Sequence, residues 1–121
     1  MPPLEIVILH EQSNQGRTVI EKFEANAADV GFAVIIASAD DHGGPISSTD
    51  LRPRARQNVL FEAGFFFSAL GRDRTAILYE EGVELPTDIA GVVYIPNNEA
   101  WPLRLAKEIR AAGFPVDLNK L

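Results

Sequence analysis

The chain has 121 residues, of which 46% are apolar and 23% charged, enough for one globular domain with a core and too few for two. Its net charge of -6 excludes a broad nucleic-acid-binding or anionic-membrane-binding surface, since both need a basic field. The absence of cysteine excludes disulfides and thiolate metal sites and favours a reducing cytoplasm. With no apolar run near the roughly 18 residues of a membrane span, we expect one soluble domain over residues 1–121.

The first half of the chain predicts two strands separated by a helix. Residues 4–9 form an apolar run that is typical of a strand, and residues 17–28 have the spacing of an amphipathic helix. Residues 32–37 form a second apolar run, as expected of a parallel strand covered on both faces. Residues 10–16 and 38–52 are polar, so we expect them to be loops, the second one long.

The second half begins with a predicted helix. Pro53 suits the first turn of this helix, and Gly71 suits its end. Strands are predicted at residues 75–79 and 92–95. Between them, residues 85–91 predict a turn with a brief helical piece.

A last helix is predicted over residues 99–112, with Leu103, Ala106 and Ile109 facing inward. The resulting order, β-α-β-α-β-β-α, favours an α/β layered domain with a mostly parallel sheet. Ligands bind such sheets beyond the carboxyl ends of the strands. Both polar loops and the start of the second helix are expected at that end.

Glu62 is the only acid between Leu51 and Arg72. On the predicted helix it borders an apolar stripe made of Ala55, Val59, Ala63, Phe66 and Leu70. We expect burial to raise the pKa of this carboxylate unless a partner compensates, and such groups are candidates for catalysis. The residues leave a second interpretation open, in which Glu62 pairs with Arg17 or Arg54.

Asp40, Asp41 and His42 lie together in the long polar loop. Adjacent residues rarely face one ion together, so a metal site is not expected and loop capping is favoured. A further possibility is that Asp40 or Asp41 binds ribose hydroxyls.

Arg52, Arg54 and Arg56 are expected at the positive end of the helix, where cations are unfavourable. Their positive charge would be compensated by an anion, which is either a nucleotide phosphate or, as we favour, the acidic residues of the loop.

Three motifs stand out in order along the chain: residues 9–24 (LHEQSNQGRTVIEKFE), 56–66 (RQNVLFEAGFF) and 83–92 (VELPTDIAGV). They resemble the bacterial TIR-like domains that are described as predicted nucleotide-binding proteins and are found in cyclic-nucleotide-triggered antiphage effectors. The resemblance implies a flavodoxin-like TIR fold, a three-layer α/β sandwich with a mostly parallel sheet. Domains of this family begin with another strand and helix, so this chain matches them from their second strand onward.

The resemblance also implies cleavage of the nicotinamide–ribose bond of NAD+, as substrate rather than cofactor, with Glu62 as the catalytic carboxylate. Loss of nicotinamide leaves a positively charged, oxocarbenium-like ribose, which a nearby carboxylate stabilises. Gly16 precedes a helix whose free N–H groups could hold a phosphate. The residues assigned to the nucleotide are His10, Glu11, Gln12, Gly16, Arg17, Thr18, Asp40, Asp41 and Asn58.

Two other functions stay open. The first is a non-catalytic module for nucleotide binding or TIR–TIR assembly. A homo-oligomer is favoured in either case, because strand edges are expected to be exposed and the phenylalanines of residues 61–67 cannot all face one core. The second is a receiver-like phosphorelay domain, which is disfavoured because Ala37 and Ser38 stand where an acidic phosphoacceptor is expected.

Overall fold

The computed structural model describes residues 21, 24–25, 30–86 and 91–120. The predicted strand at residues 4–9, the predicted loop at 10–16 and residues 87–90 of the predicted turn at 85–91 lie outside the described residues. The described residues of the first predicted helix, Glu21, Glu24 and Ala25, are helical. The elements that follow are β1 (Ala33–Ala37), β2 (Asp41–Gly43), β3 (Arg52–Arg54), α2 (Gln57–Leu70), β4 (Thr75–Tyr79), β5 (Val93–Pro96) and α3 (Trp101–Ala111), with short 3-10 helices η2 (Arg72–Arg74) and η3 (Leu118–Lys120).

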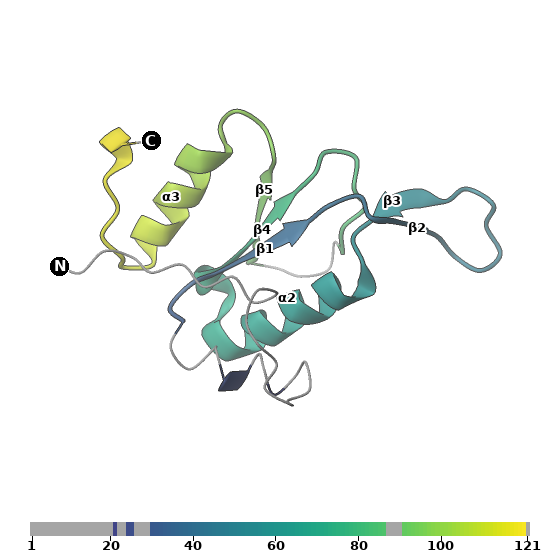
Figure 1. Ribbon diagram of the computed structural model, residues 1–121, viewed down its shortest axis with the longest axis horizontal. Coiled ribbons are helices and arrows are strands. Elements are labelled where there is room, and N and C mark those ends of the chain that lie inside the picture. Colours follow the sequence, from purple (N-terminus) through teal and green to yellow (C-terminus); the bar gives the residue numbers. More distant parts are fainter. Residues whose placement is uncertain (1–20, 22–23, 26–29, 87–90, 121) are drawn as a thin grey trace.

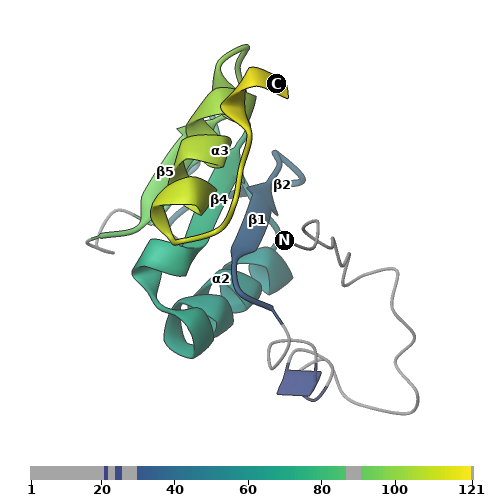
Figure 2. The same cartoon turned by 90° about the vertical axis from the view of Figure 1, so that its left-hand side faces the viewer.

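The main sheet is parallel, with strand order β1-β4-β5. Ile35 of β1 lies opposite Ile77 of β4, which in turn lies opposite Tyr94 of β5. α2 and α3 lie on opposite faces of this sheet (Figures 1 and 2). The expected layered α/β architecture with a mostly parallel sheet is therefore confirmed.

The core lies between α2 and the sheet. Val59, Ala63 and Phe66 recur at helical spacing and are buried against the small and branched side chains of β1. Within α2 the predicted stripe is thus confirmed, with Leu70 partly buried against the same core. Its first predicted member, Ala55, is also buried but lies before the helix, which begins at Gln57. The helix ends where predicted, because Gly71 adopts φ 95 and ψ 160, a region open essentially to glycine alone.

The segment before α2 differs from the prediction. Residues 38–52 are not one loop, because β2 and β3 pair antiparallel with His42 opposite Pro53. Figure 1 shows this hairpin projecting from the sheet. Pro53 therefore lies in a strand and not in the first helical turn. It is tolerated there because a two-stranded ribbon has only edge strands, where a missing N–H is harmless.

The same difference moves two of the three arginines away from the helix. Arg52 and Arg54 lie in β3, and Arg56 occupies the N-cap position of α2 with φ -60 and ψ 150. The expectation that all three lie at the positive end of the helix is wrong for Arg52 and Arg54.

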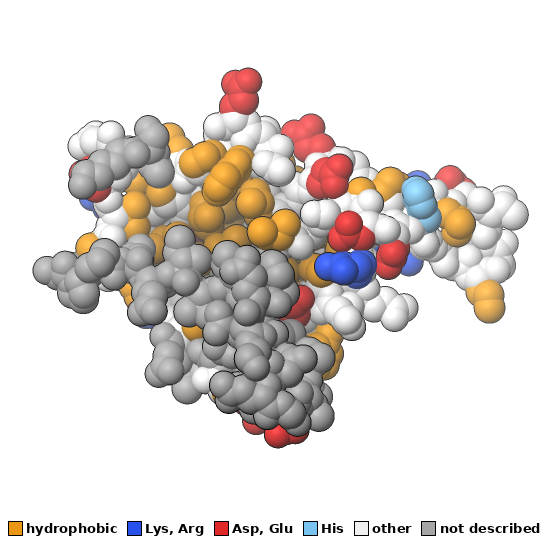
Figure 3. Space-filling model, in the orientation of Figure 1, with side chains coloured by type: hydrophobic (Ala, Val, Ile, Leu, Met, Phe, Trp, Pro, Cys, Tyr) orange, Lys and Arg blue, Asp and Glu red, His pale blue; other side chains and the backbone are white. Residues whose placement is uncertain are grey.

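The opposite face of the sheet is less covered than predicted. Val34 and Ile36 of β1 are 37% and 64% exposed, so this strand is not buried on both faces. Leu103 of α3 is 42% exposed and does not face inward, whereas Ala106 is buried. Figure 3 shows hydrophobic side chains gathered on the side where β1 and α3 lie.

Candidate functional site

The carboxyl ends of the parallel strands are tied to one another by backbone hydrogen bonds. Glu80, directly after β4, donates its N–H to the carbonyl of Ala37 at 3.0 Å. Asn97, directly after β5, donates its N–H to the carbonyl of Tyr79 at 2.8 Å. Ligands of open α/β sheets bind at this edge, because the loops that leave neighbouring strands converge there.

The start of α2 lies at the same edge. Nε of Arg56 lies 3.5 Å from Oδ2 of Asp40, which follows β1 closely. Both side chains are well exposed, so this pair contributes about 1 kcal/mol or less to stability. It shows, however, that Arg56 pairs with the acidic segment after β1, as the favoured interpretation of the arginines predicts.

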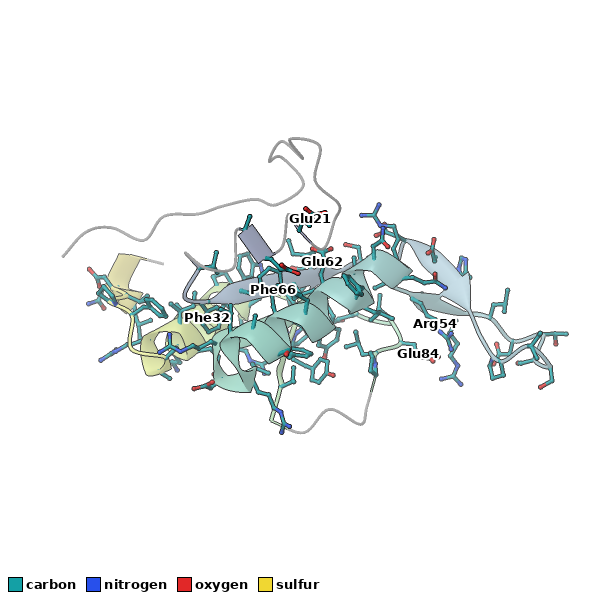
Figure 4. All side chains as sticks on the ribbon, turned by 90° about the horizontal axis from the view of Figure 1, so that it is seen from below. Glu21, Phe32, Arg54, Glu62, Phe66 and Glu84 are labelled. Carbon is teal, nitrogen blue, oxygen red and sulfur yellow. The ribbon has the colours of Figure 1, made fainter. Side chains whose placement is uncertain are left out.

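Glu62 is half-buried on α2. At 1.5 Å per residue its Cα lies about 8 Å along the helix from Gln57, the first helical residue. Val59 and Phe66, one turn before and after it, are buried against the sheet, whereas Phe61 is 48% exposed. Figure 4 shows Glu62 on the same side of α2 as Glu21. The side chain therefore lies at the border between the core and the surface.

Arg54 does not form the predicted ion pair with Glu62. Its Nη2 donates to Oε1 of Glu84 at 2.7 Å, and the backbone N–H of Glu84 donates to the carbonyl of Pro53 at 2.8 Å. In Figure 4, Arg54 and Glu84 lie near the hairpin, apart from Glu62. These contacts fasten the base of the hairpin to the segment after β4.

The predicted nucleotide-binding residues are described in part. Asp40 and Asn58 lie close to the start of α2, and Asp41 is the first residue of β2; all three are exposed. Six others lie outside the described residues: His10, Glu11, Gln12, Gly16, Arg17 and Thr18. Their assignment stays a prediction.

Sequence reasoning missed Glu80, which contacts the segment after β1 directly. Its Oε2 accepts a hydrogen bond from the backbone N–H of Ala39 at 2.8 Å. Only its position in the sequence, directly after a predicted strand, could have identified it. An acid that directly follows a predicted parallel strand lies at the ligand-binding edge of the sheet.

Three further observations concern other kinds of site in the described part of the chain. A hollow of about 300 Å³ is lined by Glu99, Pro102, Leu103 and Leu118, beside α3, and contains none of the predicted site residues. Within the described part of the chain, no three metal-ligating side chains form a cluster. Within the same part, no helix has the length and apolar character needed to cross a membrane.

Residues 2–99 match the family model described as CAP12/Pycsar effector protein, TIR domain. The chain belongs to this family. The match confirms the resemblance that the three motifs indicated, and with it a TIR-type, flavodoxin-like fold.

Individual relatives agree with this membership. The chain is 44% identical over 119 residues to "Uncharacterized protein YuaY" of Escherichia coli (strain K12), which covers 97% of this chain and 40% of that protein. It is 44% identical over 84 residues to the Pycsar effector protein BcPycTIR of Burkholderia cepacia, covering 64% of this chain and 25% of the effector. CD-NTase-associated protein 12 of Flavobacterium daejeonense is 33% identical over 72 residues, or 60% of this chain and 22% of that protein. The chain thus spans less than half the length of these relatives.

Proposed function

We propose that this TIR domain is the NAD+-cleaving module of an antiphage effector, with Glu62 as its catalytic carboxylate. The observation that carries the proposal is the placement of Glu62, half-buried on a helix that starts at the carboxyl end of the sheet. Membership of the CAP12/Pycsar effector family supports the effector role. The name of the relative from Burkholderia cepacia, a Pycsar effector protein, agrees with that role.

The proposed reaction breaks the bond between the anomeric carbon of the ribose and the nicotinamide nitrogen. The bonding electrons leave with nicotinamide, which becomes neutral, so no general acid is needed. The ribose carries the positive charge until water attacks the anomeric carbon and releases a proton. A carboxylate beside that carbon stabilises the charge, and partial burial strengthens the interaction by excluding water. ADP-ribose and nicotinamide are the products.

In this proposal, the remaining nucleotide contacts come from the edge of the sheet. Asp40 and Asn58 are exposed near the start of α2, where their side chains can accept hydrogen bonds from ribose hydroxyls. The predicted loop at residues 10–16 and the predicted helix start after Gly16, both outside the described residues, would hold the phosphates.

Glu62→Gln tests the catalytic assignment, because it removes the charge and keeps the shape. We expect nicotinamide release from NAD+ to fall by about 100-fold or more, with an unchanged circular dichroism spectrum and melting temperature. Glu81→Gln is the matched control, since Glu81 is exposed and the described residues offer its side chain no hydrogen bond or ion pair. Equal turnover of NAD+ by wild type and Glu62→Gln would overturn the assignment.

A second candidate function is a non-catalytic module for nucleotide binding or TIR–TIR assembly. It is favoured by the exposed Val34 and Ile36 and by the edge of β1, which among the described strands pairs only with β4. An apolar face next to an open strand edge invites association with a second copy. Calorimetry and light scattering separate the candidates, since NAD+ binding by an oligomer without nicotinamide release supports this second one.

A further inference from the structure

Glu80 contacts the segment that leaves β1 at two points. Its backbone N–H bonds the carbonyl of Ala37, the last residue of β1, at 3.0 Å. Its side-chain Oε2 accepts from the backbone N–H of Ala39 at 2.8 Å. One residue of the neighbouring strand end therefore holds both the end of β1 and the turn after it.

The turn itself has two further restraints. The N–H of Asp40 bonds the carbonyl of Ser38 at 2.9 Å, which closes a tight turn. The carboxylate of Asp40 then faces Arg56 at the start of α2, at 3.5 Å. The direction in which Asp40 points thus depends on a turn whose amide at Ala39 is held by Glu80.

These contacts contribute more to the shape of the turn than to the stability of the domain. Ala39, Asp40 and Glu80 are all exposed, so water replaces their hydrogen bonds at small cost when the chain unfolds. A ligand that binds one shape of a turn gains affinity when that shape is populated beforehand.

We infer that Glu80 is a positioning residue for the nucleotide site. It acts through the backbone of Ala39 and presents Asp40 to the ribose hydroxyls of a dinucleotide. A carboxylate beyond the carboxyl end of a parallel strand is well placed to bind such hydroxyls. The inference rests on the proposed function, because it names how that same site recognises its substrate.

Steady-state kinetics with NAD+ test the inference. Glu80→Ala removes the acceptor, so we expect KM to rise about tenfold, with kcat and the melting temperature little changed. Glu80→Gln keeps an acceptor oxygen, so we expect it to restore most of the wild-type KM. Glu81→Ala is the control and should leave KM unchanged. A merely structural role would lower the melting temperature and would not separate KM from kcat in this way.

Amide hydrogen exchange at Ala39 supplies a readout that does not need turnover. In the intact chain, exchange at the amide of Ala39 should be faster in Glu80→Ala than in wild type or Glu81→Ala. Normal turnover with an unchanged KM in Glu80→Ala would overturn the inference and leave the proposed function standing. Glu80→Gln behaving like Glu80→Ala would also overturn it, because the acceptor oxygen would then not matter. A wild-type protein that releases no nicotinamide but shows the exchange difference would sink the proposed function and, with it, the role toward NAD+.

Discussion

Replacing Phe66 with alanine tests how α2 packs against the sheet, and therefore in which direction the side chain of Glu62 points. Phe66 is 3% exposed and belongs to the core cluster of α2 and β1. Its ring meets that of Phe65 edge to face, with centroids 5.2 Å apart. Because Glu62 lies one turn before Phe66 on the same helix, a rotation that exposed the ring would also redirect the carboxylate.

The expected loss follows from burial. Removing a buried phenylalanine ring forfeits about 1.5–3 kcal/mol of transfer free energy, and the cavity left behind raises the total to about 3–5 kcal/mol. Domains of this size have about 5–15 kcal/mol of stability, so a folded but weakened variant is expected. The melting temperature should fall by roughly 4 °C per kcal/mol, or about 12–20 °C.

The matched control is Phe61→Ala, on the same helix at 48% exposure. Its ring already contacts water over much of its surface, so about 1 kcal/mol or less should be lost. Urea unfolding followed by far-ultraviolet circular dichroism measures both variants. If the two losses are equal, α2 does not present Phe66 to the core, and the placement of Glu62 at the border of the core is wrong as well.

Two further predictions concern the backbone and pH. Gly71→Ala should lower the unfolding free energy by about 1–3 kcal/mol, since φ is 95 there and Asp73 Oδ1 lies 3.0 Å from the new Cβ. Gly64→Ala, at an exposed position inside α2, should raise it by about 0.5–1 kcal/mol, and thermal melts giving both changes the same sign would contradict this reasoning. Burial raises the pKa of Tyr94 above its ordinary 10.0, and its hydroxyl donates to the carbonyl of Pro86 at 2.8 Å. The folded state keeps this phenol protonated where the unfolded chain ionises it, so stability is full below pH 10.0 and is lost as pH rises through the higher folded pKa. Urea midpoints should fall less steeply with rising pH in Tyr94→Phe, and identical slopes would refute the assignment.

Local patterns predicted the elements that depend on neighbouring residues. The strand at Thr75–Tyr79 has the predicted bounds, and α3 lies within the predicted range. The inward face of α2 was predicted because its apolar residues recur at the helical period. The hairpin of β2 and β3 was missed because its strands are short and polar, and their pairing brings together residues that no periodic pattern links.

The contacts of the candidate site were likewise predicted only in part. An interaction between the acidic loop and an arginine was predicted from charge. In the structure, Arg56 is the arginine that pairs with Asp40. The partnership of Arg54 with Glu84 and that of Glu80 with Ala39 were not predicted. These contacts join residues far apart in the chain, at distances that only the packing of the strands sets.

By itself, the sequence determined the α/β class and the family, because these are carried by periodicity and by contiguous motifs. The catalytic role of Glu62 stays a prediction. Tertiary structure alone decided which carboxylates hold which backbone groups at the edge of the sheet. It also decided that α3 leaves Val34 and Ile36 exposed on β1. The physical reason is that a hydrogen bond or an uncovered face depends on how separate elements pack together in space, which no local run of residues specifies.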